Sequence, residues 1–169
     1  MDLSSIYASF AQVVITPPSV GVIACIVITV LLLVASGLAS GSEIAFFSLS
    51  PKDLANLNPE RDERDRKIQL LRDDSERTLA TILIANNLVN VTIIILCNYI
   101  FGAIVDFGNS FWLQFICVTV ILTFLLLLFG EVIPKVYARQ SSLAFCRLCI
   151  NGLVMARKLT WPIALLLIK

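Results

Sequence analysis

The sequence predicts an all-α membrane protein with three transmembrane helices and cytoplasmic juxtamembrane helices. Its 169 residues are 58% hydrophobic, and the mean hydropathy of +0.90 lies far above that of an ordinary soluble domain. Three apolar stretches, about 20–48, 79–101 and 111–136, are each long enough to cross roughly 30 Å of hydrocarbon. Basic residues are confined to two separate regions, as in a chain that crosses a membrane several times.

The placement of the basic residues predicts the orientation of the chain. All 13 Lys and Arg residues lie either from Lys52 to Arg77 or from Lys135 to Lys169. Because cytoplasmic segments carry the excess of Lys and Arg, both regions are expected in the cytoplasm. Residues 1–19 and the turn near 102–110 are then outside. The expected location is the cell membrane (inner or cytoplasmic), with an outer N-terminus and a cytoplasmic C-terminus.

The first span carries small and polar residues on one side. Four polar side chains project within about 60° of one another on a helical wheel: Thr29, Ser36, Ser40 and Glu43. Gly37 and Gly41 form an adjacent small-x-x-x-small strip, which lets another helix approach closely. A tight helix contact alone is one interpretation of these residues. Glu43 argues for more, because helix packing does not need a carboxylate.

The hydrophilic segment 50–78 predicts short cytoplasmic helices. Ser50-Pro51-Lys52-Asp53 is typical of an N-cap, a proline in the first turn and a capping box. Asn58-Pro59 predicts a second helix start, and the acids within 73–76 favour the start of the next helix through its dipole. The net charge of this segment is near zero, so nucleic acid is not an expected partner.

The second span is rich in asparagine. Asn86, Asn87 and Asn90 occupy roughly one 100° face, and Asn98 lies near it two turns later. Asparagine side chains inside a membrane can bridge helices by hydrogen bonds, which is the plainer interpretation. Three asparagines so close together are more than one such contact requires.

The third span ends in a charged motif. It carries no charge until it reaches GEVIPK (130–135). An ionisable residue at that depth is costly and usually marks a pathway or an ion site. Because Pro134 has no N–H, the Gly130 carbonyl that it would bond in an α-helix is expected to be free beside Glu131. The alternative is a salt bridge from Glu131 to Lys135, one turn on.

The segment Arg139–Lys158 carries too many charges to cross hydrocarbon. Its basic residues share about a 120° arc, which predicts a basic helix at the cytoplasmic interface over 139–160, ended by Trp161-Pro162. Cys146 and Cys149 form a C-x-x-C. Because the chain has no histidine and no second cysteine pair, neither a zinc site nor a redox pair is expected.

The polar groups of the three spans are all oxygen donors. Amide oxygens, hydroxyls, a freed carbonyl and one or two carboxylates suit Mg²⁺, Ca²⁺ or Mn²⁺, whereas softer metals prefer thiolate or imidazole ligands. An enzyme is not expected, because the spans hold no histidine and no nucleophile–base pair. Two classes remain: a divalent-cation transporter, and a non-transporting assembly or sensing protein.

Three ordered motifs resemble those of the CNNM/CorC magnesium transporter family and its DUF21-type transmembrane domain. SGSEIAFFSLS (40–50) is similar to that family's S-x-S-E-x-A-x-x-S-x-S, LIANNLVN (83–90) to its I-x-x-N-N-x-x-N, and GEVIPK (130–135) to its G-E-x-x-P-K. The resemblance covers about residues 20–165. It implies a homodimer of three-span protomers in the lipid bilayer, with a basic juxtamembrane belt formed by 50–78 and 139–160.

The resemblance also implies a site and its ions. Mg²⁺ would be held by serines of the first span, asparagines of the second and the glycine–glutamate pair of the third: Ser36, Ser40, Asn86, Asn87, Asn90, Gly130 and Glu131. It implies Mg²⁺ export in exchange for Na⁺. Family members also have cytoplasmic CBS modules that bind ATP and a C-terminal domain, so this chain is expected to be an isolated transmembrane domain. Some bacterial relatives are named hemolysins or gliding-motility accessory proteins, which keeps the assembly or sensing alternative open.

Overall fold

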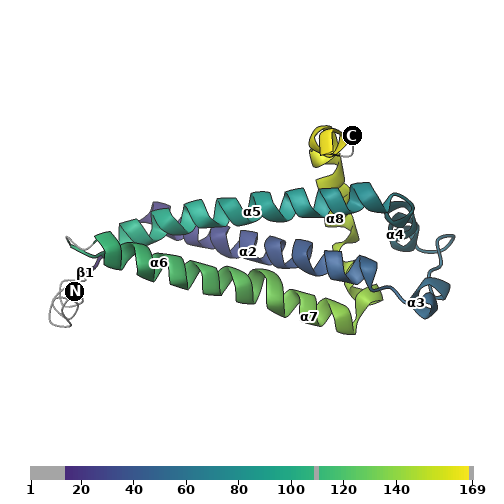
Figure 1. The fold of residues 1–169 in the computed structure, drawn as a ribbon, viewed down its shortest axis with the longest axis horizontal. Coiled ribbons are helices and arrows are strands. Elements are labelled where there is room, and N and C mark those ends of the chain that lie inside the picture. The colour runs from purple at the N-terminus through teal and green to yellow at the C-terminus, as the bar shows by residue number, and fades with distance from the viewer. Residues whose placement is uncertain (1–13, 109–110, 168–169) are drawn as a thin grey trace.

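The structure, a computed structural model, describes residues 14–108 and 111–167. Three long helical stretches lie side by side along its length (Figure 1). They are α2 (Val20–Phe47), α5 (Ser75–Ile104), and a third made of α6 (Phe111–Leu125), the π-helical η1 (Leu126–Val132) and α7 (Ile133–Gln140). Within the described residues these three stretches are long and apolar enough to cross a membrane. The three predicted spans are thereby confirmed.

The outward faces of the spans are apolar. In the most apolar part of each span, only 22%, 22% and 17% of the residues are buried inside the protein. Leu31, Ile95 and Phe124, one from each span, are 65%, 64% and 64% exposed. Hydrophobic surface on this scale is unfavourable in water and suits helices surrounded by lipid.

Two short helices connect the first two spans. α3 (Pro51–Ala55) begins with the predicted capping box, in which Ser50 Oγ accepts from Asp53 N at 3.2 Å and Ser50 N donates to Asp53 Oδ2 at 3.0 Å. α4 (Glu63–Asp73) begins after Asp62, so the helix start predicted at Asn58-Pro59 is wrong. Residues 58–62 form a turn instead, because the Asn58 carbonyl accepts hydrogen bonds from Arg61 N and Asp62 N.

The last helix, α8 (Ser142–Leu167), crosses the spans at the end that carries α3 and α4 (Figure 1). The prediction of one helix starting at Arg139 is wrong, because the backbone breaks at Ser141 (φ −140°, ψ 59°). The predicted end at Trp161-Pro162 is also wrong, since the helix continues to Leu167. A proline inside a helix removes one N–H donor, but its fixed φ is helical.

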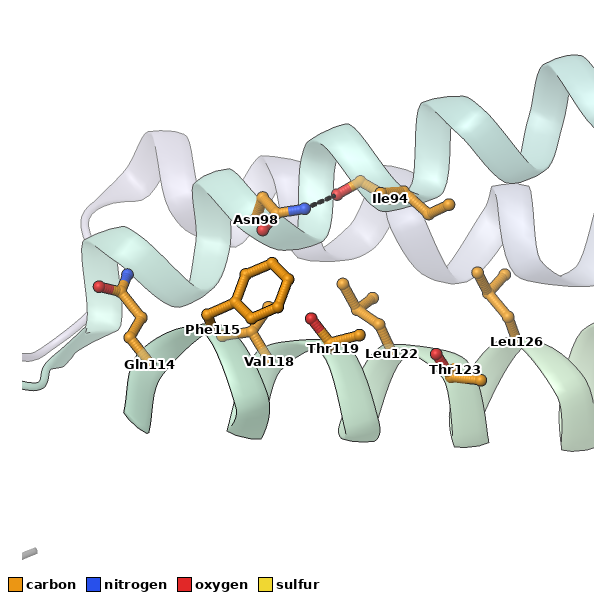
Figure 2. Close-up of a pocket in the computed structure, with 9 residues that line it drawn as sticks. All are labelled: Ile94, Asn98, Gln114, Phe115, Val118, Thr119, Leu122, Thr123 and Leu126. Atoms are coloured by element: carbon orange, nitrogen blue, oxygen red, sulfur yellow. Dashed lines mark hydrogen bonds between the residues drawn. The ribbon is translucent and has the colours of Figure 1, made fainter. Parts of the chain in front are cut away.

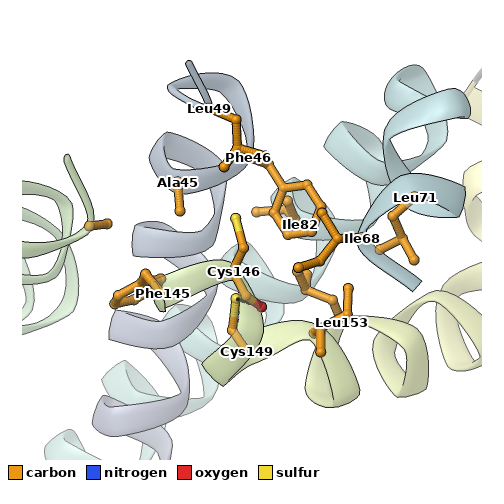
Figure 3. Close-up of a cluster of buried hydrophobic side chains, with 12 residues drawn as sticks. Ala45, Phe46, Leu49, Ile68, Leu71, Ile82, Phe145, Cys146, Cys149 and Leu153 are labelled. Atoms are coloured by element: carbon orange, nitrogen blue, oxygen red, sulfur yellow. Dashed lines mark hydrogen bonds between the residues drawn. The ribbon is translucent and has the colours of Figure 1, made fainter. Parts of the chain in front are cut away.

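A buried apolar cluster fastens α8 to the spans (Figure 3). It joins five helices through Phe46 of α2, Leu71 and Ile68 of α4, Ile82 of α5, Ala138 of α7, and Phe145, Cys146, Cys149 and Leu153 of α8. Burial raises the pKa of Cys146, and it raises the pKa of Cys149 to about 12. Both thiols therefore stay protonated at neutral pH and pack as small apolar groups.

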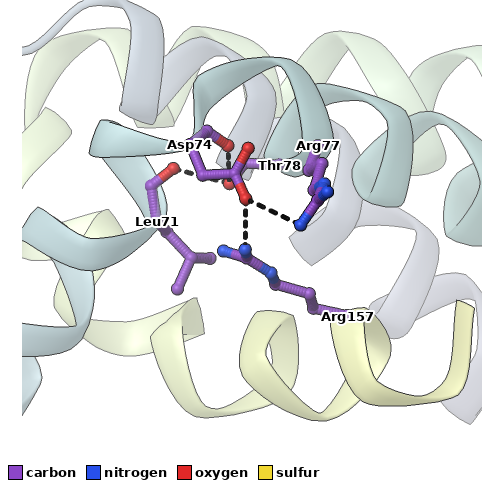
Figure 4. A network of polar contacts seen from close by, with 5 residues as sticks. All are labelled: Leu71, Asp74, Arg77, Thr78 and Arg157. Atoms are coloured by element: carbon purple, nitrogen blue, oxygen red, sulfur yellow. Dashed lines mark hydrogen bonds and ion pairs between the residues drawn. The ribbon is translucent and has the colours of Figure 1, made fainter. Parts of the chain in front are cut away.

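Polar contacts join α8 to the start of α5 (Figure 4). Arg157 Nη2 donates to Asp74 Oδ2, and Arg77 Nη1 lies 3.6 Å from the same carboxylate oxygen. The Thr78 hydroxyl lies 2.6 Å from the Leu71 carbonyl and 2.9 Å from the Asp74 carbonyl. Part of the basic face predicted for this helix is thus used for contacts within the chain.

The opposite end of the bundle is tied by a short antiparallel ribbon. β1 (Val14–Ile15) pairs with β2 (Val105–Asp106), with Val14 opposite Asp106. Nearby, an apolar cluster around Ile93 and Val118 packs α5 against α6. Most of the N-terminal segment predicted to lie outside the membrane, residues 1–13, falls outside the described residues.

The glycine strip of α2 packs against the same chain. A Cβ atom on Gly37 would lie 2.9 Å from Pro134 Cγ and 3.2 Å from the Phe129 carbonyl oxygen. A Cβ atom on Gly41 would lie 2.5 Å from Phe145 Cζ and 3.2 Å from the Pro134 carbonyl oxygen. The close approach predicted for this strip therefore serves α7, η1 and α8, and the strip is not available to a partner protomer.

Replacing Gly37 with Leu should separate α2 from the third span. Overpacking typically costs about 1–3 kcal/mol, and here one of the crowded atoms is backbone. Gly102→Leu on α5 is the matched control, because a Cβ atom there meets nothing within 4 Å. Thermal unfolding in detergent, followed by the loss of the folded size-exclusion peak, should show a lower midpoint for Gly37→Leu only. Equal midpoints for the two variants would contradict this packing.

Candidate functional site

The candidate site is centred on Ser36, in the middle of α2. Ser36 is fully buried (0% exposed), and its hydroxyl oxygen lies 2.6 Å from Asn90 Oδ1 and 3.2 Å from Asn86 Oδ1. Asn86 and Asn90 are one turn apart on α5, so both face the same point of α2. The structure therefore brings the polar faces of the first two spans together.

This arrangement has more acceptors than protons. The Ser36 hydroxyl carries one proton, whereas two amide oxygens, from Asn86 and Asn90, lie within hydrogen-bonding distance of it. With the amides oriented as they are here, only one of the two can receive that proton. Three oxygen atoms that converge with a single proton form a favourable place for a cation.

The third span reaches this point through Gly130. Gly130 is buried, and a Cβ atom on it would lie 3.2 Å from Ser36 Oγ. Any side chain here would press on the serine hydroxyl, so glycine lets the backbone of η1 lie directly beside it. The three spans thus meet at Ser36, Asn86, Asn90 and Gly130.

The backbone around Gly130 is π-helical over Leu126–Val132. Ile133 N donates to the Leu128 carbonyl, five residues back, where an α-helix would use four. The α-helical spacing assumed from the sequence is therefore wrong in this turn. Pro134, which cannot donate, follows in the first turn of α7. Single π-helical turns of this kind are frequent at functional sites.

Lys135 forms its ion pair with Glu43 of α2 and not with Glu131. Lys135 Nζ lies 3.6 Å from Glu43 Oε2, so the predicted alternative of a Glu131–Lys135 bridge is wrong. Both partners are more than one-third exposed (37% and 39%), and such a pair is worth about 0–1 kcal/mol. Glu131 is half-buried and makes no ion pair or hydrogen bond within the described part of the chain.

Two of the predicted site residues lie apart from this cluster. Asn87 is exposed and makes no hydrogen bond among the described residues. Ser40, one turn from Ser36, is 1% exposed, and its hydroxyl has no hydrogen-bond partner in the described part of the chain. Thr81 of α5, which sequence reasoning missed, is likewise 1% exposed and without a partner. Leaving a buried hydroxyl unsatisfied costs about 1–3 kcal/mol.

Further polar residues lie in a groove between α5 and α6, toward the β1–β2 end (Figure 2). The groove has a volume of about 450 Å³ and holds the polar side chains of Asn98, Gln114, Thr119 and Thr123. Asn98 donates from Nδ2 to the Ile94 carbonyl at 2.9 Å. Asn98, which the sequence placed near the asparagine face, is therefore not part of the Ser36 cluster.

The donor chemistry limits which metals the cluster suits. Within the described residues, no three His, Cys, Asp or Glu side chains gather in a way that could hold a metal ion. A cation at Ser36 would be bound by neutral oxygens, and Glu131, the residue after Gly130 in the chain, carries a carboxylate. Hard, strongly hydrated cations accept such ligands, whereas copper, zinc and iron favour nitrogen or sulfur.

Comparison with known proteins identifies the domain. The family model of the cyclin M (CNNM) transmembrane N-terminal domain matches residues 27–169. The chain belongs to this family. It is 32% identical over 148 residues to the metal transporter cnnm-4 of Caenorhabditis elegans, across 82% of this chain and 30% of that protein. It is 30% identical over 116 residues to a UPF0053 protein of Haemophilus influenzae, across 69% of this chain and 26% of that protein.

The CNNM match confirms the family that the three motifs resemble. It includes the candidate residues of all three spans, from Ser36 to Glu131. Together with the three apolar helices, it establishes a multi-pass membrane domain. The chain spans less than a third of the length of either relative, so it corresponds to one part of those longer proteins.

Proposed function

We propose that this CNNM domain carries a divalent cation, Mg²⁺, across the membrane. The observation that carries this proposal is the meeting of Ser36, Asn86 and Asn90 beside Gly130 at the junction of the three spans. The name of the C. elegans relative, a metal transporter, favours the same function.

The residues have distinct roles in the proposed site. The hydroxyl of Ser36 and the amide oxygens of Asn86 and Asn90 replace water molecules of the ion, and the Gly130 carbonyl adds a further ligand. Glu131 supplies the negative charge. Because Mg²⁺ loses its water reluctantly, several oxygens held in place in advance are needed to compensate. Asn87 lies outside this set, and Ser40 lies one turn away from it.

The orientation of transport is also a proposal. The Lys and Arg distribution supports a cytoplasmic location for α3, α4 and α8 and an outer location for the β1–β2 end. Export driven by Na⁺ entry follows from the family resemblance, as does control by ATP through CBS modules beyond this chain. The ions that move are Mg²⁺ and Na⁺.

We propose that the domain works as a homodimer that meets along the α5–α6 groove. Polar side chains facing lipid are costly, and Asn98, Gln114, Thr119 and Thr123 line this groove. A second protomer would cover them and supply hydrogen-bonding partners. A protomer-sized mass by light scattering in mild detergent would contradict the dimer.

Flux through the purified chain tests transport against the alternative, an assembly or sensing role. Vesicles that contain the chain and a Mg²⁺-sensitive dye should show Mg²⁺ movement that Asn90→Ala abolishes. Thr92→Ala is the control, because Thr92 is half-buried and, among the described residues, its hydroxyl donates only to the Leu88 carbonyl of its own helix. Mg²⁺ binding without any flux would favour sensing.

A further inference from the structure

The ion pair of Glu43 and Lys135 lies between the Ser36 cluster and one end of the spans. Glu43 is seven residues after Ser36 on the same face of α2, which places it about 10 Å closer to the end that carries α3, α4 and α8. Lys135 comes from α7, four residues after Glu131. A cation that left the cluster along this face of α2 would meet the pair.

Two buried hydroxyl groups, those of Ser40 and Thr81, lie along the helices between the level of Ser36 and the level of Glu43. Ser40 lies between Ser36 and Glu43 on the face of α2 that they share. Thr81 is on α5, and because α5 runs antiparallel to α2, Thr81 lies beyond Asn86 in the direction of Glu43. Both residues are 1% exposed, and neither hydroxyl has a hydrogen-bond partner among the described residues. Buried polar groups are nearly always paired, so each of these hydroxyls is free to bind a water molecule or a cation.

We propose that Glu43, Ser40 and Thr81 form a second cation station, which the Lys135 ammonium occupies in this structure. A hydrated divalent cation that moves between the Ser36 cluster and the α3/α4/α8 end displaces Lys135 from Glu43 and is relayed by the two hydroxyls. This inference rests on the proposed function. It assigns a role to Glu43, which the Ser36 cluster does not use.

The geometry of Lys135 suits a displaceable occupant. Its ammonium is 3.6 Å from Glu43 and more than one-third exposed, so the pair is loose and partly hydrated. A divalent cation carries twice the charge and is attracted more strongly to the same carboxylate. The long, flexible lysine stem lets the ammonium move away into solvent.

Mg²⁺ titration calorimetry of the whole chain in detergent tests the second station. The wild type should bind one Mg²⁺ per chain. Lys135→Met removes the resident ammonium and should add a second, weaker Mg²⁺ event, which Lys135→Met combined with Glu43→Gln should remove again. Lys67→Met is the matched control, because Lys67 also forms a half-exposed pair, with Glu63 on α4. That control should bind one Mg²⁺.

The outcomes separate the station from the proposed function. If Lys135→Met binds Mg²⁺ as the wild type does, the second station is wrong. Lys135→Gln takes its place in this test if Lys135→Met does not fold. If the wild type then still binds one Mg²⁺, the proposed function stands. If the wild type binds none while Lys135→Met binds one, the station is supported and the Ser36 site is overturned. No binding in any variant would overturn both.

Discussion

Glu131→Gln should abolish Mg²⁺ binding to the folded chain. The substitution keeps the shape of the side chain and removes the negative charge that the proposed site takes from Glu131, the residue after Gly130 in the chain. Two unit charges 4 Å apart attract by about 4 kcal/mol at an effective dielectric constant near 20, and a divalent ion doubles this. Desolvation offsets part of that attraction. Since about 1.4 kcal/mol corresponds to a factor of ten, we expect at least about 100-fold weaker binding.

The control for this variant is Glu76→Gln, an exposed glutamate in the first turn of α5. Isothermal titration should give wild-type affinity for Glu76→Gln and no measurable binding for Glu131→Gln, with the same unfolding midpoint for both. A purely structural role for Glu131 predicts the reverse, which is a changed midpoint and an unchanged Mg²⁺ affinity. That result would remove Glu131 from the site.

The three spans were predictable from the sequence because long apolar segments have few alternatives in a membrane. Length and hydropathy alone locate α2, α5 and the third span. The capping box at Ser50 was predictable for a similar reason, since its hydrogen bonds are local. Such features depend on residues close together in the chain.

Several features that the sequence left open or misassigned depend on contacts between distant residues. The sequence suggested Glu131, one turn away, as a partner for Lys135. In the folded chain Lys135 pairs instead with Glu43 of α2. Gly37 and Gly41 were correctly expected to allow close packing, yet only the folded chain shows that Pro134 and Phe145 use the space. The π-helical turn at Gly130 also has no reliable sequence signal beyond Pro134 itself.

The candidate site was predictable face by face but not as an assembly. Ser36 and the asparagines could be placed on helix faces, because spacing fixes the direction of each side chain. Which asparagine meets Ser36 depends on the register between α2 and α5, and that register selects Asn86 and Asn90 over Asn87. Thr81 gave no signal, because a lone threonine in a span is unremarkable until its burial is known.

Arg147→Gln should destabilise the junction between α4 and α8. Arg147 donates from Nε and Nη2 to the two carboxylate oxygens of Asp65, each at 2.7 Å, and Asn58 N adds a third bond at 2.9 Å. The Asp65 side chain is only 1% exposed. Removing one partner of a buried pair costs about 3–5 kcal/mol, and since Arg147 is 35% exposed we expect on the order of 2–4 kcal/mol.

The pH dependence gives this prediction a second test. The hydrogen bonds from Arg147 hold the pKa of Asp65 below its ordinary value of 3.8. The pair therefore stabilises the fold fully above this ordinary pKa, which Asp65 has in the unfolded chain, and that contribution is lost as the pH falls through the lower folded pKa. The difference in unfolding midpoint between wild type and Arg147→Gln should thus be largest near neutral pH and shrink below about pH 4. Arg139→Gln, at an exposed arginine of α7, should unfold like the wild type at both pH values. If Arg147→Gln unfolded like Arg139→Gln at pH 7, the pair would not be what joins the two helices.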